Sequence, residues 1–449
     1  MGQSGQTKKQ VHLNVFIRGA GHHAGAWKHP LANPKSDLEL EHYAELARIA
    51  ERGLLDSLFM ADNYSGLGRR LEPFTLLSAL AALTKHIGFI ATVSTTYNDP
   101  FHVARKFASL DHISKGRAAW NIVTGHSQAD ADNFGKPGHP ELTKRYDIGD
   151  EFVEVTKQLW DSWEEDALVY DRETDTTIDS GKVHEINFKG SYYSVKGPLN
   201  IPRPPQGYPV LVQAGSSESG KELAAKTAEV IFTAQQTLGA AQEFYTDVKS
   251  RLAKYGRTPD QLLIMPGLGP IVADTEAEAK DLEDELNSLV DTKKSLKRLS
   301  NYFDVDLSEY PLDAPVPVDR AKPYGTVKGG ITSRHEVVID AAIRDNMTIR
   351  QFLSRSYGGH GHVTFTGSVI QVADFIEKWL NEGGADGFNL LPAIYPSGLE
   401  TFVDKVIPEL QNRGIFRTAY EGSTLRENLG LARPENGHKQ VWALRREAN

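Results

Sequence analysis

The sequence contains no cysteine. This absence excludes disulfide bonds, thiolate metal ligands and a cysteine nucleophile, and it is compatible with a reducing cytoplasm. No apolar run approaches the ~18 residues that a membrane helix needs, and the first ten residues are polar, unlike a signal peptide. We therefore expect a soluble, cytoplasmic protein without a membrane partner.

A strongly basic composition is missing as well. The 50 Lys and Arg residues are outnumbered by 59 Asp and Glu, which gives a formal net charge of -9. No stretch concentrates enough basic residues to follow a phosphate backbone, so nucleic acid is not an expected partner. The 449 residues can bury a large core, and length alone allows one α/β domain with insertions or two or three smaller domains.

Several catalytic signatures are also absent. The sequence has no G-x-x-x-x-G-K-[ST] loop, no strand-linked G-x-G-x-x-G and no G-x-S-x-G elbow. These absences disfavour a P-loop nucleotidase, an ordinary NAD-binding Rossmann domain and a serine hydrolase. His360 and His362 lie in a glycine-rich loop without a convincing carboxylate partner, so we expect no metal site.

What the sequence does contain is a repeated alternation of short apolar strands and amphipathic helices. The residues R-A-A-W-N-I-V-T, from Arg117 to Thr124, are typical of a buried parallel strand that ends in polar side chains and a glycine. The same reasoning predicts strands at 11–17, 57–61, 87–93, 117–124, 210–214, 230–234, 262–272 (interrupted by Pro266-Gly267) and 386–391. Helices are predicted at 37–52, 73–84, 101–114, 146–163, 218–227, 242–253, 275–289, 368–381 and 399–413.

Eight strands joined by helical crossovers must lie parallel in a sheet that helices cover. An open doubly wound sheet and a closed (β/α)8 TIM barrel both satisfy this pattern, and eight units with polar residues at the strand ends favour the barrel. We predict one barrel domain over residues 1–449, with insertions at about 164–208, which holds a hairpin, and at about 291–366. One rim of that barrel would carry Asp62, Thr92, Asn121, Thr124 and Ser216.

The sharpest local chemistry is Q-A-G-S-S-E-S-G, residues 213–220. A strand that gives way to Gly-Ser-Ser at a helix start aims backbone N–H groups and hydroxyls at one point, which suits the phosphate of a nucleotide-like ligand. The alternative is an ordinary helix N-cap. The position late in a barrel favours phosphate binding. His22 and His23, after the first strand, either face a substrate or serve in packing and capping.

Several long motifs span nearly the whole chain. They are H-H-A-G-A-W-K-H-P (22–30), S-L-D-H-I-S-K-G-R-A-A-W-N-I-V-T (109–124), R-Y-D-I-G-D-E-F (145–152), K-V-H-E-I-N-F-K-G-S-Y-Y (182–193), G-P-L-N-I-P-R-P-P-Q-G (197–207), Q-A-G-S-S-E-S-G (213–220) and G-x-x-R-x-x-Y-x-G-x-T-L-R-E-N-L-G-L (414–431). Together they resemble the nitrilotriacetate monooxygenase family of flavin-dependent monooxygenases, within the bacterial luciferase-like superfamily.

The resemblance implies a (β/α)8 barrel that binds reduced FMN (FMNH2) at the strand carboxyl ends. It also implies O2 as co-substrate, a separate NAD(P)H:flavin reductase that supplies FMNH2, and a homodimer or homotetramer. Carried over by motif, the cofactor contacts are Asp62, Thr92, Asn121, Tyr146, Ser216 and Ser217. Several relatives have a histidine four residues before the tyrosine, where this chain has Leu142.

The implied function is the oxidation of a small organic sulfur or nitrogen compound with C–S or C–N cleavage, and an N-acetyl-S-substituted cysteine fits this class. We expect His22, His23 and Asn63 to line the substrate pocket. The 291–366 insertion is expected to act as a lid that carries His335, with Arg334 binding a substrate carboxylate. The alternatives are a flavin-binding protein without turnover and a barrel oxidoreductase that uses deazaflavin F420.

Overall fold

The computed structural model describes residues 9–66, 68, 70–125, 127–323, 332–359 and 361–437, with the backbone alone described at 332–336 and 338. The chain divides into two compact units. Unit 1 comprises the chain up to Phe59, Gly68–Leu71 and Ile231–Ala419, and unit 2 comprises Met60–Leu67, Glu72–Val230 and the chain from Tyr420 onward.

Within the described residues, nine strands form the main sheet. They are β1 (His12–Phe16), β2 (Ser57–Met60), β3 (Gly88–Ser94), β4 (Ala118–Val123), β9 (Val210–Gln213), β10 (Val230–Thr233), β11 (Leu263–Ala273), β12 (Val363–Ser368) and β13 (Gly387–Leu390). Their order is β10-β9-β4-β3-β2-β1-β13-β11-β12, and a further pairing of β10 with β11 closes a ring of eight strands that leaves out β12. These eight strands are the eight that the sequence predicts, and the ring is that of a (β/α)8 barrel.

The strands of unit 1 pair in parallel. In β1, Asn14 pairs with Ser57 of β2 and with Asn389 of β13. Two residues further along β1, the ring of Phe16 lies 5.1 Å from that of Phe59, in an edge-on arrangement. Because side chains alternate across a strand, the same face carries a polar layer followed by an aromatic one.

The strands of unit 2 show the same alternation. In β4, Trp120 is fully buried and packs against Phe152 and Trp160, and its indole Nε1 donates to the carbonyl of Val93 at 3.1 Å. The next residue, Asn121, therefore points to the opposite face of the strand. This register places the apolar side chain against the helices and the polar one inside the ring.

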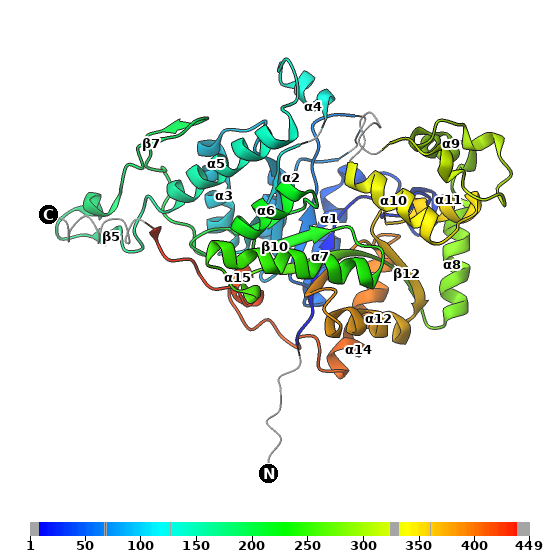
Figure 1. Ribbon diagram of the computed structural model, residues 1–449. Helices are drawn as coiled ribbons and strands as arrows, with labels where there is room; N and C mark the ends of the chain where they lie inside the picture. Colours follow the sequence, from blue (N-terminus) through cyan, green and yellow to red (C-terminus); the bar gives the residue numbers. More distant parts are fainter. Residues whose placement is uncertain are drawn as a thin grey trace, which may run out of the picture. The chain divides into compact units, whose positions relative to one another are not determined.

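Fifteen α-helices are found in the described residues. They are α1 (Leu40–Arg52), α2 (Pro73–Leu83), α3 (Pro100–Ser114), α4 (Gln128–Asn133), α5 (Leu142–Trp160), α6 (Glu218–Thr227), α7 (Leu238–Arg251), α8 (Glu276–Ser288), α9 (Thr292–Leu299), α10 (Thr332–Arg344), α11 (Ile349–Tyr357), α12 (Val369–Asn381), α13 (Ser397–Thr401), α14 (Ile407–Asn412) and α15 (Leu425–Asn428) (Figure 1). None of these helices is long and apolar enough to cross a membrane.

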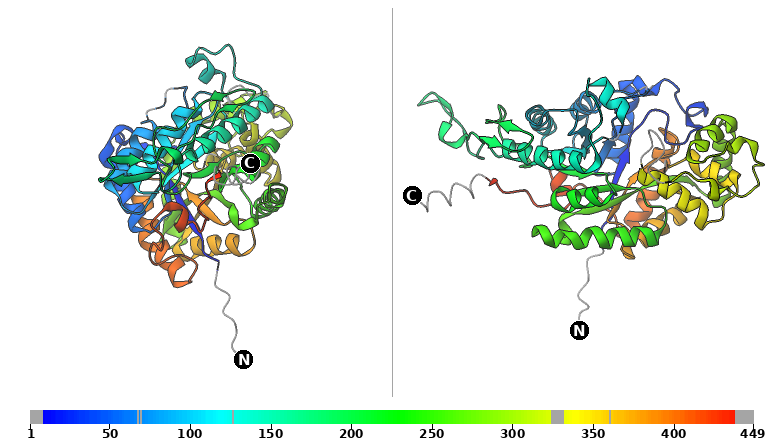
Figure 2. Two further views of the ribbon diagram at one scale, coloured as in Figure 1. Left: turned by 90° about the vertical axis from the view of Figure 1, so that its left-hand side faces the viewer. Right: turned by 45° about the horizontal axis from the view of Figure 1, so that its top comes forward.

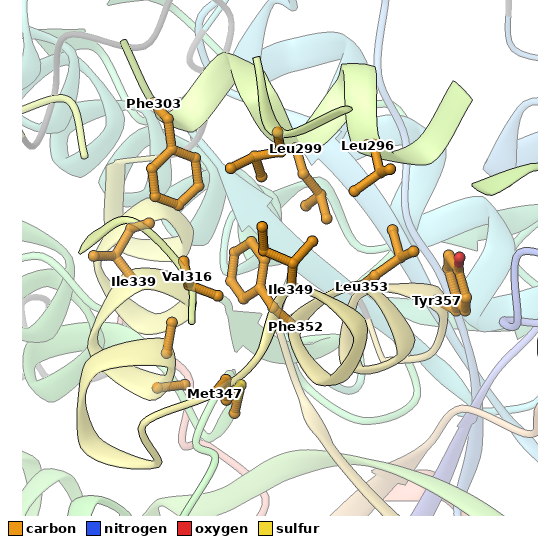
Figure 3. Close-up of a cluster of buried hydrophobic side chains, with 13 residues drawn as sticks. Leu296, Leu299, Phe303, Val316, Ile339, Met347, Ile349, Phe352, Leu353 and Tyr357 are labelled. Atoms are coloured by element: carbon orange, nitrogen blue, oxygen red, sulfur yellow. The ribbon is translucent and has the colours of Figure 1, made fainter. Parts of the chain in front are cut away.

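Both predicted insertions have structure of their own. After α5 come two short hairpins, β5 (Leu168–Asp171) with β6 (Thr176–Ile178) and β7 (Phe188–Lys189) with β8 (Ser194–Val195), which reach away from the helices of unit 2 (Figure 2). After α8, helices α9, α10 and α11 surround a separate cluster of buried side chains that includes Leu296, Leu299 and Phe352 (Figure 3).

Some predicted boundaries were wrong. The segment 262–272 was predicted with an interruption at Pro266-Gly267, but β11 is one continuous strand. Gly267 fits within it because the ring of His362 lies too close for any Cβ at this position. Strand β12 was missed, since it lies at the end of a segment that we assigned to an insertion. The hairpin of β5 and β6 and the short helix α4 were missed too, and α5 covers 142–160 rather than 146–163.

Candidate functional site

A polar pair lies on the inward face of two neighbouring strands of unit 2. Thr92 of β3 and Asn121 of β4 are register partners, and the amide nitrogen of Asn121 donates to the hydroxyl of Thr92 at 2.9 Å. Both residues are buried, and the side-chain carbonyl oxygen of Asn121 has no hydrogen-bond partner within the described part of the chain. Leaving a buried acceptor unsatisfied is unfavourable, so this oxygen fits a ligand that brings an N–H donor.

The turn from β9 into α6 forms a second polar feature of unit 2. A Cβ added at Gly215 or at Gly220 would lie 3.0 Å from the hydroxyl oxygen of Tyr146, so this hydroxyl faces the turn. The side chain of Gln213 lies beneath Gly215 and keeps its carbonyl oxygen without a partner among the described residues. The structure thus brings Tyr146 of α5 to the Q-A-G-S-S-E-S-G motif, which lies about seventy residues further along the chain.

The start of α6 realises the N-cap that the sequence offered as an alternative. The hydroxyl of Ser217 accepts a hydrogen bond from the backbone N–H of Gly220 at 3.2 Å. Ser216, just before it, is half-buried. Because the first N–H groups of a helix have no partner within the helix, this end can still attract an anion beside the capping hydroxyl.

The group that the sequence predicts here is a flavin mononucleotide. The hydroxyls of Tyr146 and Ser216 and the α6 N-terminus are donors suited to a phosphate. The unsatisfied oxygen of Asn121 is an acceptor suited to a ring N–H. The donor and acceptor set of unit 2 therefore fits this cofactor.

The loop after β2 contains two further predicted residues. Asp62 is half-buried, and one of its carboxylate oxygens accepts from the N–H of Asn63 at 2.9 Å. Asn63 is exposed and donates its amide to the carbonyl of Ser65 at 2.6 Å. The side chain of Asn63 therefore shapes this loop, and its contact with a substrate stays a prediction.

Sequence reasoning missed a cluster in unit 2 formed by Tyr97, His139 and Arg145. The guanidinium of Arg145 donates to Nε2 of His139 at 3.0 Å, which fixes the imidazole proton on Nδ1, and Nδ1 then donates to the hydroxyl oxygen of Tyr97 at 2.6 Å. Burial lowers the pKa of Arg145, and Nε of this residue has no partner among the described residues. The R-Y-D motif contained the available signal, but only the fold brings the three side chains together.

The two adjacent histidines of unit 1 are buried. Nδ1 of His23 accepts from the N–H of Gly25 at 3.1 Å, so the proton lies on Nε2, which donates to Asn287 at 3.2 Å. Burial lowers the pKa of His23 to about 4, so the ring is neutral near pH 7. His22 interacts through Nε2 with the carbonyl of Phe16 at 2.7 Å. Both imidazoles brace the loop after β1, and their contact with a substrate stays a prediction.

The remaining predicted positions give less information. Leu142 is the exposed first residue of α5, so it offers no polar contact. The side chains of Arg334 and His335 lie outside the described residues, as does His360. His362 is buried, stacks on Phe232 with ring centroids 4.6 Å apart, and has Nδ1 3.2 Å from the carbonyl of Thr233.

The chain is similar to known proteins over most of its length. The family described as "Luciferase-like monooxygenase" matches residues 16–311. N-acetyl-S-(2-succino)cysteine monooxygenase of Bacillus subtilis is 51% identical over 96% of this chain and 98% of its own length. Nitrilotriacetate monooxygenase component A of Aminobacter aminovorans is 48% identical over 95% and 98%.

A solved structure shows the same fold. The crystal structure of long-chain alkane monooxygenase superposes with a TM-score of 0.80 at 34% sequence identity, and it covers 94% of this chain and 96% of that one. This likeness agrees with the parallel ring of eight strands and confirms the predicted barrel.

Proposed function

Because the chain belongs to the luciferase-like monooxygenase family, we propose that it is the oxygenase of a two-component system that uses FMNH2 and O2. It is a flavin-dependent monooxygenase, an oxidoreductase. A separate NAD(P)H:flavin reductase supplies the reduced cofactor. The name of the relative from Aminobacter aminovorans, "component A", supports this division between two proteins.

The proposed cofactor site lies within unit 2. Ser216, the α6 N-terminus and the hydroxyl of Tyr146 hold the phosphate, and Thr92 with Asn121 lies against the ring system. Ser217 caps the turn beside the phosphate, and Asp62, which follows β2, is a further candidate cofactor contact. The single observation that carries this proposal is the Tyr146 hydroxyl, which faces the 215–220 turn.

The Tyr97, His139 and Arg145 cluster takes the place of the histidine that several relatives have where this chain has Leu142. Arg145 fixes His139 in one tautomer, and His139 leaves the hydroxyl proton of Tyr97 available for donation. A hydrogen-bonded chain of this kind presents one oriented donor to a ligand. We expect it to orient the cofactor.

The proposed substrate is a thioether of the N-acetyl-S-(2-succino)cysteine kind. The 51% identity to a monooxygenase named for that compound supports this choice. When bound, FMNH2 supplies two electrons and activates O2. One oxygen atom enters a C–H bond next to sulfur, the other leaves as water, and the hydroxylated carbon releases the thiol and becomes a carbonyl.

The chain binds and orients the cofactor and the substrate, and it excludes water from them. His22, His23 and Asn63 are our candidates for lining the substrate pocket, with Arg334 for a substrate carboxylate and His335 on a lid. An unchanged ratio of product to O2 consumed in His335→Ala would remove this histidine from the mechanism. We also propose a homodimer or homotetramer, which light scattering on a sizing column measures.

A reconstitution experiment tests the function. The purified chain is mixed with a flavin reductase, NADH, FMN, O2 and N-acetyl-S-(2-succino)cysteine, and thiol release is measured. We expect release only when every component is present. Tight FMN binding without release from any thioether or amine would favour the non-catalytic alternative. Activity that requires deazaflavin F420 and does not depend on O2 would favour the F420-dependent oxidoreductase.

A further inference from the structure

Unit 1 contains a pocket of about 800 Å³ that none of the predicted site residues lines. This volume is typical of small-molecule sites. The pocket lies among the loop after β1, the segment that joins α8 to α9, and one side of α9. Its lining residues are Ala24, Trp27, Lys28, Leu289, Val290, Asp291, Lys294, Ser295, Lys297, Arg298 and Asn301.

The pocket is strongly basic although the chain is acidic overall. Four of its lining side chains are cations, namely Lys28, Lys294, Lys297 and Arg298, whereas Asp291 is its one acid. The carboxylate of Asp291 caps α9 by accepting from the N–H of Lys294 at 3.0 Å. On α9 the three basic positions are three and four residues apart, so they share one helix face. Cations gathered on one wall of a pocket attract an anion with more than one charge.

An aromatic side chain lies beside these cations. Trp27 is 52% exposed, which is unusual for so large an apolar residue. The ammonium of Lys28 lies 5.5 Å from the centre of the Trp27 ring and donates to the carbonyl of Leu289 at 2.8 Å. A flat indole surface is therefore presented next to positive charge.

The walls of the pocket are held in place before any ligand arrives. The N–H of Ala24 donates to the carbonyl of Tyr357 at 2.8 Å, and His23 bonds to Asn287 of α8. Gly25 approaches Leu286 too closely for a side chain. The apolar face of α9 is buried in the cluster of Figure 3. Binding therefore needs little ordering of the backbone, and its ordering cost falls on the exposed side chains of α9.

We propose that this pocket binds a small molecule that joins a flat aromatic ring to a phosphate dianion, which is the chemistry of FMN. The ring stacks on Trp27, and the phosphate pairs with Lys294 and Arg298. The inference rests on the proposed function, in which flavin arrives from another protein. A second flavin position outside the site of turnover raises the local concentration of the cofactor.

Equilibrium dialysis of oxidised FMN against the whole chain tests the inference. We expect two FMN molecules per chain. The double variant Lys294→Ala/Arg298→Ala, and separately Trp27→Ala, should weaken one of them at least tenfold and leave the other unchanged. Lys293→Ala is the matched control, because Lys293 is exposed on the same helix without lining the pocket.

Two further ligands separate the parts of the proposal. Riboflavin has the ring without the phosphate, and pyrophosphate has the charge without the ring, so each should bind the pocket at least tenfold more weakly than FMN. Equal binding of either compound would overturn the inference.

The two proposals fail in different ways. A single FMN that Tyr146→Phe weakens and the double variant leaves untouched would overturn the second site while supporting the cofactor site of unit 2. A single FMN that only the double variant weakens would support the pocket and contradict the cofactor site.

Discussion

At the scale of single residues, the candidate site depends on buried polar groups that lack some of their hydrogen bonds within the described residues. That Asn121 and Thr92 lie near each other could be predicted, since a polar residue near the carboxyl end of an apolar strand stands out in the sequence. His139 could not, because its significance comes from contacts with Tyr97 and Arg145 that only the folded loops create.

Replacing Tyr146 by Phe removes the hydroxyl that faces the 215–220 turn. A hydrogen bond to a charged group contributes about 1.5–3 kcal/mol, so we expect FMN affinity for the unit 2 site to fall by roughly 10-fold or more. Riboflavin, which has no phosphate, should bind the variant as it binds the wild type. Titrations of both ligands measure this ratio, and an equal loss for both would place the phosphate elsewhere.

The buried imidazole of His23 makes stability depend on pH. The pKa of His23 is about 4 in the folded protein and 6.5 in the unfolded chain. At pH values between these two, the unfolded chain therefore binds one proton more than the folded protein. The contribution of neutral His23 to the free energy of unfolding is fully present above about pH 6.5 and is lost as the pH falls toward 4. From about pH 7.5 to about pH 5 this group should remove about 2 kcal/mol of the free energy of unfolding. In urea titrations His23→Gln should lack this loss, and a pH profile equal to that of the wild type would contradict the assignment.

At the scale of elements, caps and periodicity predicted most helices. Thr275 and Glu278 form the expected capping box of α8, and α6 begins and ends where the sequence places it. The hairpin of β5 and β6 could not be predicted, because its strands are exposed on both faces and carry no alternation. Strand β12 could not be predicted because it lies between a glycine-rich loop and the capped start of α12.

The start of α6 separates capping from ligand binding. Ser217→Ala removes the cap on Gly220 and should lower the free energy of unfolding by about 1 kcal/mol. Ser216→Ala is the matched variant, and it should leave stability near the wild type while weakening FMN. Urea unfolding and FMN titration of the two variants test this. The same effect from both changes would mean that the neighbouring serines share one role.

At the scale of the whole molecule, the ring of eight strands could be predicted from the number and order of the repeats. The ion pairs of Arg426 and Arg433 could not be predicted, because they join residues far apart in the sequence. Arg426 is buried and pairs with Glu229, whereas Arg433 pairs with Glu165 near the surface. Charge in a sequence does not reveal which cations become buried.

These two arginines make a matched pair of variants in unit 2. Arg426→Ala leaves the mostly buried carboxylate of Glu229 without its cation and should cost about 3 kcal/mol or more of the free energy of unfolding. Arg433→Ala breaks a partly exposed pair and leaves Glu165 with Arg203, so it should cost less than about 1 kcal/mol. Chemical denaturation compares them, and equal losses would show that burial does not decide the contribution.

The central claim is that this barrel uses reduced flavin and O2 to oxidise a small thioether. A single-turnover experiment tests it most directly: the chain, FMNH2 and N-acetyl-S-(2-succino)cysteine are mixed without O2, O2 is then added, and the thiol is counted. The account predicts no thiol before O2 and about one thiol for each FMNH2 bound afterwards. Thiol release that does not need O2, or complete conversion of the O2 to hydrogen peroxide without thiol, would contradict it.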